Sequence, residues 1–118
     1  MTEYVILFPA DDEKERVRRT PEERQAIFDK DFEFGQRLEA CGGSVTGGSA
    51  LTPSNEARTL ERGPNATVQV RSGPHKDAPG QLSGFFVVTC DDYDELVEAA
   101  HVLTAVHPVV EIRPVQHF

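Results

Sequence analysis

The residue types best suited to chemistry meet in one loop, SGPHKDAPG, which runs from Ser72 to Gly80. His75 and Asp77 lie two positions apart in it, and an imidazole beside a carboxylate suits proton transfer near neutral pH. We therefore take His75 and Asp77 as the candidate catalytic pair, and Ser72 and His75 as candidate ligand contacts. Two alternatives stay open: His75 contacts a ligand without catalysing, or it is a plain surface histidine.

Three residues elsewhere are further candidates for ligand binding. Arg113 alternates with Ile112 at the end of an apolar segment, so it could point into a cleft and hold an anion, or form a salt bridge at the edge of a sheet. Phe28 and Phe32 lie off the main apolar stripe of their predicted helix. They either wall a pocket, extend the core or meet a partner subunit.

The sequence indicates neither a metal site nor a bound cofactor. The histidines lack HxxxH or HxH spacing, Cys41 and Cys90 form no CxxC pair, and the glycines form neither GxGxxG nor a Walker pattern. We interpret both cysteines as small buried hydrophobic residues.

Two helices and several strands must position these residues. Thr20, Pro21 and Glu23 predict the start of a helix through a capping box, and Gly42 with Gly43 predicts its end. Asp91 or Asp92 begins a second helix that reaches about Leu103. Strands are predicted over residues 3–8, in a short segment after Ser44, and over 57–62, 66–72, 84–90 and 109–115.

This order of elements predicts an α+β fold, a ferredoxin-like two-layer sandwich with a mainly antiparallel sheet and two helices on one face. The strands at 4–8 and 85–88 are apolar on both alternations. Their face away from the helices would be exposed in a monomer. We expect a homodimer joined sheet to sheet, with a ligand-covered sheet face as the alternative.

Composition limits the class of protein. The 118 residues form one domain, 1–118, and the formal charge of −8 disfavours nucleic acid as a partner. We expect no membrane association and a cytoplasmic location, because no apolar run is long enough to span a bilayer and the first residues lack a signal-peptide pattern.

The chain resembles the YCII-related family, specifically its DGPF branch of small proteins that form a dimeric α+β barrel. The resemblance runs nearly end to end and centres on SGPHKDAPGQLSGFFVV. Gly73-Pro74, Gln81-Leu82 and Gly84-Phe85 match the motif of that branch. Ser72 stands where the family has aspartate and Asp77 where it has glutamate. The resemblance implies a site near this loop, and a His/Asp acid-base pair has been suggested for some relatives.

Three functions remain open. The first is a small-molecule-binding homodimer with a pocket between the sheet, the first helix and the Ser72–Gly80 loop, for a small polar or anionic ligand. The second is a metal-independent lyase or hydrolase that uses His75 and Asp77. The third is a regulatory interaction protein that acts through its dimer. Fold alone does not choose among them.

Overall fold

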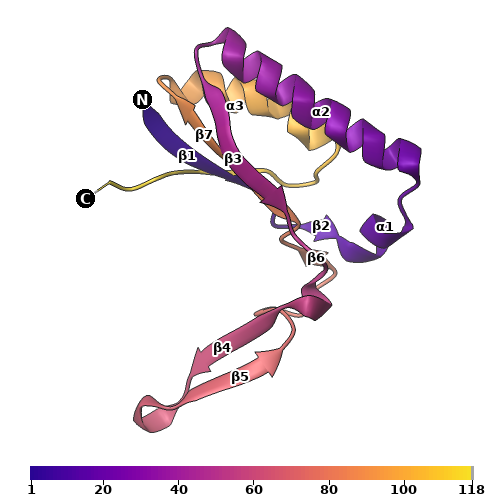
Figure 1. Cartoon of the computed structure of the whole chain (residues 1–118), viewed down its shortest axis with the longest axis vertical. Coiled ribbons are helices and arrows are strands. Elements are labelled where there is room, and N and C mark those ends of the chain that lie inside the picture. The colour runs from indigo at the N-terminus through magenta and orange to yellow at the C-terminus, as the bar shows by residue number, and fades with distance from the viewer. Residues whose placement is uncertain (118) are drawn as a thin grey trace.

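The main sheet has four strands in the order β3-β7-β1-β8, and each neighbouring pair is antiparallel. The computed structural model describes residues 1–117 (Figure 1). The strands are β1 (Thr2–Leu7), β3 (Ser44–Ala50), β7 (Gly84–Cys90) and β8 (Glu111–Pro114). The two central strands, β7 and β1, are the β-branched and aromatic runs of the sequence. The predicted α+β sandwich of ferredoxin-like kind is thus confirmed.

Residues 1–117 form three α-helices, of which the shortest, α1, was not predicted from the sequence. They are α1 (Glu13–Arg18), α2 (Pro21–Ala40) and α3 (Tyr93–Ala100), and α3 continues as the 3-10 helix η3 (His101–Ala105). At the start of α2 the Glu23 amide donates to Thr20 Oγ1 at 3.1 Å, and the Thr20 amide donates to Glu23 Oε1 at 3.2 Å. Both halves of the predicted capping box are present. Gly42 after α2 has a φ of +87°, as the predicted left-handed cap requires.

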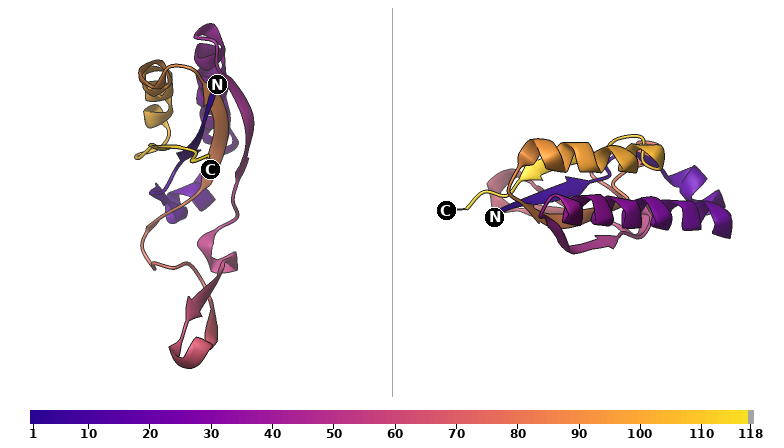
Figure 2. Two further views of the ribbon diagram at one scale, coloured as in Figure 1. Left: turned by 90° about the vertical axis from the view of Figure 1, so that its left-hand side faces the viewer. Right: turned by 90° about the horizontal axis from the view of Figure 1, so that it is seen from above.

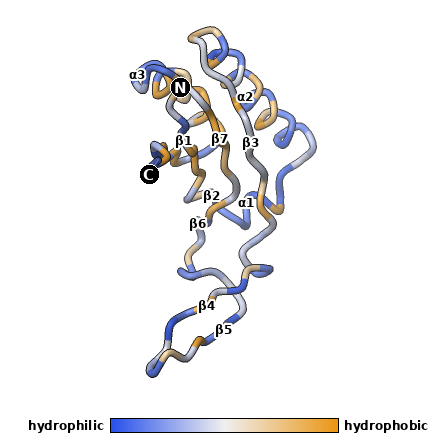
Figure 3. Tube along the Cα trace, turned by 60° about the vertical axis from the view of Figure 1, so that its left-hand side comes forward, coloured by the Kyte–Doolittle hydropathy of each residue, from blue (hydrophilic) through white to orange (hydrophobic). Residues whose placement is uncertain are grey.

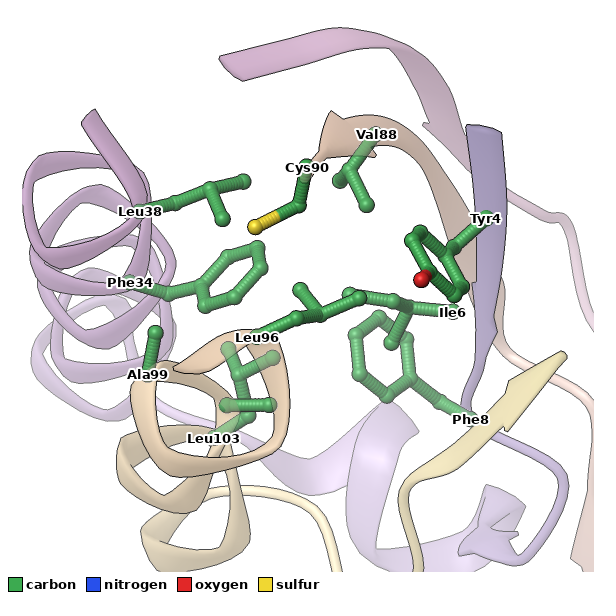
Figure 4. Packing of buried hydrophobic residues seen from close by; sticks show 11 residues of the cluster. Tyr4, Ile6, Phe8, Phe34, Leu38, Val88, Cys90, Leu96, Ala99 and Leu103 are labelled. Atoms are coloured by element: carbon green, nitrogen blue, oxygen red, sulfur yellow. The ribbon is translucent and has the colours of Figure 1, made fainter. Parts of the chain in front are cut away.

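The core lies between the main sheet and the two longer helices (Figure 4). Alternate residues of β1 and β7 point to the helices because side chains alternate along a strand. Phe34 and Leu38 of α2 and Leu96 of α3 meet them, and all three are fully buried. Burying each of these large side chains contributes roughly 1.5–3 kcal/mol to stability.

The other face of the main sheet has no layer over it. Val5, Leu7, Phe85 and Val87 share this face, as the pairing of Val5 with Val87 and of Leu7 with Phe85 shows. The molecule extends only 18 Å along its shortest axis, and the edge views show its thinness (Figure 2). A single chain therefore forms an open two-layer sandwich and closes no barrel.

A hairpin projects from the end of this body. It joins β4 (Arg58–Arg62) to β5 (Val68–Ser72), and these strands pair only with each other (Figure 1). Val68 and Val70 are each 63% exposed. The predicted strand over 66–72 is present as β5, but neither of its faces is covered, because a lone two-stranded ribbon has no second layer. Figure 3 shows its mixture of hydrophobic and hydrophilic residues.

Short elements connect the hairpin and α1 to the sheet. The two-residue strands β2 (Asp11–Asp12) and β6 (Gly80–Gln81) pair with each other. Single 3-10 turns, η1 (Ser54–Glu56) and η2 (Pro64–Ala66), flank β4.

Cys90 is buried as predicted, whereas Cys41 is only half-buried because it lies where α2 ends. Among residues 1–117 no helix is both long and apolar enough to cross a membrane.

Candidate functional site

A pocket of about 520 Å³ opens between the main sheet and helices α1 and α2. Apolar side chains form much of its wall, and several charged or polar side chains reach into it. Its lining comprises Phe8, Asp11, Arg16, Arg19, Arg24, Ile27, Phe28, Asp31, Gly48, Ser49, Ala50, Ser83, Gly84, Phe85, Phe86 and His107. A concave, mostly apolar pocket with a few convergent polar groups is typical of small-molecule sites.

Three segments far apart in sequence bring the polar groups together. Asp11 begins β2 directly after β1, and its side chain is 1% exposed. Ser83 precedes β7, where its amide donates to the Phe8 carbonyl at 3.0 Å. His107 follows η3, and its amide donates to the Leu103 carbonyl at 2.9 Å. Backbone hydrogen bonds thus fix two of the three segments next to the site.

Asp11 and His107 form a buried pair. His107 Nδ1 lies 2.9 Å from Asp11 Oδ2, and the Ser83 hydroxyl donates to the same oxygen at 2.6 Å. The imidazole also stacks on Phe8, with ring centroids 3.8 Å apart and planes 12° apart. A carboxylate at Nδ1 and an aromatic ring on one face hold the imidazole in one orientation and place its second nitrogen, Nε2, on the other side.

Nε2 of His107 has no hydrogen-bond partner although it is buried. The carboxylate oxygen nearest to Nε2 is Asp31 Oδ1. It lies 3.8 Å away, which is beyond hydrogen-bond distance. Asp31 Oδ1 is itself buried without a partner, and so is Asp11 Oδ1. Buried polar atoms normally have partners, so this group has unused hydrogen-bonding capacity beside the pocket.

Charge and burial act in opposite directions on the pKa of His107. Burial by itself lowers this pKa, but the hydrogen bond to Asp11 and the negative charges of Asp11 and Asp31 outweigh it, so the pKa is raised above 6.5. We assign the effect of Asp31 to its charge, given the 3.8 Å separation. Protonation of His107 near neutral pH therefore leaves a charged imidazolium held between two carboxylates.

The pKa of Asp11 shifts the other way. Burial raises it, but the hydrogen bonds from His107 and Ser83, together with the charges of His107 and Arg19, lower it below 3.8. Asp11 is thus a carboxylate that orients His107 and stabilises its charged form. Such a pair can take a proton from a bound molecule at Nε2 and return it.

The structure separates most of the sequence-predicted site residues from this pocket. His75 and Asp77 are exposed in the segment between β5 and β6, and the His75 carbonyl accepts from Arg71 Nη2 at 2.9 Å. Ser72 is exposed at the end of the hairpin. No residue of the Ser72–Gly80 loop lines the pocket. A catalytic role for His75 with Asp77 stays a prediction.

Of the remaining candidates, only Phe28 lines the pocket. Its side chain is 63% exposed, and Phe32, one turn further along α2, is 68% exposed and lies outside the lining. Arg113 donates from Nε to Glu111 Oε2 at 2.7 Å. It therefore forms the edge salt bridge that the sequence left open as an alternative.

No pattern in the sequence predicted the group formed by Asp11, Asp31, Ser83 and His107. Asp11 and His107 are 96 positions apart, and no spacing rule connects them. One usable signal was local: Asp11 comes two residues after the strand-ending Pro9, and His107 comes just before the helix-ending Pro108. Both therefore lie where elements end and side chains can converge.

No group of three or more histidine, cysteine, aspartate or glutamate residues within residues 1–117 has a geometry that could hold a metal ion.

Comparison with known proteins gives two matches. A family model described as the YCII-related domain matches residues 2–118. An uncharacterized protein of Rhizobium meliloti (strain 1021) is 28% identical over 114 residues, which cover 94% of this chain and 90% of that protein.

Proposed function

The chain belongs to the YCII-related domain family, and from its own geometry we propose that it is an enzyme that moves a proton to or from a small molecule. His107 is the proposed acid-base group and Asp11 its orienting carboxylate. The observation that carries the proposal is the Nε2 atom of His107. It is buried at the pocket without a partner, while Nδ1 is held 2.9 Å from Asp11.

The reaction class that fits best is that of a lyase. Ser83, a hydroxyl in the pocket lining, already donates to Asp11 at 2.6 Å. Because the pKa of Asp11 is lowered, this carboxylate is too weak a base to activate Ser83 as a nucleophile. A single positioned imidazole can instead remove a proton from carbon and donate it to a departing group. Hydrolysis by a water activated at Nε2 is the alternative that uses the same atom.

A proton-exchange screen tests this proposal. Full-length protein is incubated in D2O with small carbonyl compounds and organic acids, and NMR follows deuterium incorporation and conversion. We expect His107→Gln to slow any exchange or turnover by about 10²-fold or more, the contribution of a positioned acid-base group. His75→Ala should leave the rate unchanged. A His107→Gln protein that keeps the wild-type rate would show that His107 is not the acid-base group.

We also propose a homodimer that joins the uncovered sheet faces. The proposal is supported by the apolar face of Val5, Leu7, Phe85 and Val87, over which residues 1–117 form no further layer.

Within the family, the matches at Gly73-Pro74 and Gly84-Phe85 support the DGPF-like branch. The two free cysteines fit the proposed cytoplasmic location.

A regulatory interaction protein is the second candidate function, and Phe32 is the observation that favours it. This aromatic side chain is 68% exposed on α2 and lies outside the pocket lining. Proton transfer in the pocket therefore does not explain why an aromatic residue is exposed there. Under this candidate, Phe32→Ser would abolish a regulatory effect and leave proton exchange unchanged. Phe28→Ser would change both, because Phe28 lines the pocket.

A further inference from the structure

The pocket holds an unusual concentration of positive charge for this chain. Arg16, Arg19 and Arg24 all line it, although the formal charge of the chain is −8. Arg16 lies on α1, Arg19 in the link that follows it, and Arg24 in the first turns of α2. The segment from Arg16 to Arg24 thus contributes three positive charges to the lining of the pocket.

No carboxylate within residues 1–117 forms an ion pair with any of these three arginines. Arg16 donates to the Leu51 carbonyl, and Arg24 Nη1 donates to the Arg19 carbonyl at 3.0 Å. These bonds position the guanidinium groups of Arg16 and Arg24 through neutral carbonyl acceptors rather than through ion pairs. Arginine is suited to binding carboxylate or phosphate oxygens because it can donate two parallel hydrogen bonds.

The two acids of the pocket pair with His107 rather than with the arginines. Asp11 is already hydrogen-bonded to His107 and Ser83, and Asp31 is separated from His107 Nε2 by only 3.8 Å. Both carboxylates therefore face the imidazole. Arg19 is close enough to Asp11 for its charge to act on that carboxylate, so the positive charge lies next to the proposed acid-base pair.

Much of the remaining lining is apolar. Phe8, Ile27, Phe28 and Phe86 contribute to the wall, and Phe28 is 63% exposed. An apolar body in the pocket would bury part of that ring. Positive charge and an aromatic wall in the same pocket define a ligand with two matching parts.

We propose that the substrate is a small organic anion, whose carboxylate or phosphate group binds the arginines and whose apolar body contacts Phe28 beside His107. This inference rests on the proposed function for the role of His107.

Binding of matched probes tests the inference. Benzoate and phenyl phosphate carry the two kinds of anion on one ring, and benzamide is the neutral counterpart of benzoate. Affinities for the full-length protein are measured by NMR titration at low and high salt. We expect an anion to bind at least about tenfold more tightly than benzamide and to weaken as salt screens the arginines. The better of the two anions identifies the head group.

Substitutions show which arginines cause the preference for anions. Arg19→Gln and Arg24→Gln should each weaken binding of the preferred anion by about tenfold and leave benzamide unchanged. Arg19→Lys should retain part of the preference because it keeps the charge. Arg113→Gln is the matched control, since that arginine pairs with Glu111 outside the pocket, and it should bind like the wild type.

Three results would overturn the inference: benzamide binding as tightly as the anions, an anion preference that survives in both glutamine variants, or no binding of any probe at millimolar concentration. None of them bears on proton transfer by His107, which the exchange screen measures separately. Conversely, anion binding that depends on Arg19 would stand even if His107→Gln kept the wild-type exchange rate.

Discussion

Asp11 combines deep burial with two hydrogen bonds, so its side chain should matter for stability as well as for chemistry. Replacing Asp11 with alanine leaves His107 Nδ1 and the Ser83 hydroxyl without their acceptor. We expect Asp11→Ala to lower the free energy of unfolding by about 2–3 kcal/mol, the usual cost of leaving buried polar groups unpaired. Urea denaturation measures it, and the exposed Asp77→Ala is the control, with no loss expected.

The pKa of His107 predicts how stability depends on pH. Because the folded-state pKa is raised above 6.5, the folded protein holds the proton more tightly than the unfolded chain does. The stabilisation is complete below pH 6.5 and is lost as the pH rises through the raised folded-state value. The His107→Gln protein should lack this slope in urea midpoints as the pH rises above 6.5. An equal slope in both proteins would contradict the assigned shift.

At this scale the sequence showed which residues can do chemistry but not which of them meet. His75 and Asp77 are neighbours in sequence and lie exposed, whereas Asp11 and His107 are 96 positions apart and 2.9 Å apart in space. Pairing of this kind depends on how β2 and the end of η3 meet in the fold, and no local pattern encodes it. An apolar side chain off the main stripe of a helix is a local signal that pointed to both Phe28 and Phe32, and only Phe28 lines the pocket.

Among the elements, β3 forms one wall of the pocket through a glycine in an unusual conformation. Gly48 has a φ of +142°, and a Cβ there would overlap the Phe85 carbonyl oxygen and lie 2.8 Å from Phe86 Cδ1. Gly47 beside it would place a Cβ no closer than 3.8 Å to Val87. The first position requires glycine and the second does not.

Alanine substitutions should separate these two glycines. We expect Gly48→Ala to lower the free energy of unfolding by about 1–3 kcal/mol, through backbone strain and contact with the pocket wall. Gly47→Ala should cost less than about 0.5 kcal/mol. Thermal denaturation of both proteins checks this, and similar melting temperatures for the two variants would mean that β3 does not pack against Phe86 as described.

Elements with strong local signals were predictable, and those that depend on other parts of the chain were not. Capping residues set the limits of α2, and the apolar run over residues 84–90 gave β7 with its observed bounds. The alternation of Val68 and Val70 also predicted a strand, but it suggested a covered face that the structure does not provide. Periodicity shows which residues share a face, and it does not show whether another layer lies over it.

At the scale of the whole molecule, the uncovered sheet face decides the oligomeric state. We expect light scattering to give the mass of two chains, because the apolar face of β1 and β7 would otherwise contact water. Val87→Asp should shift the protein to a single chain by placing a charge on this face. Val97→Asp, on the exposed side of α3, is the control and should remain dimeric. A wild-type protein with the mass of one 13.1 kDa chain would contradict the proposed dimer.

The proposed chemistry depends on the protonation state of the His107 imidazole. NMR of the His107 side-chain nitrogens across pH measures its pKa and shows which nitrogen keeps the proton in the neutral ring. We predict a pKa above 6.5, a neutral form protonated at Nδ1 toward Asp11, and an Nε2 that is free to accept a proton. A pKa at or below 6.5, or a neutral form protonated at Nε2, would contradict the assignment of His107 as the acid-base group.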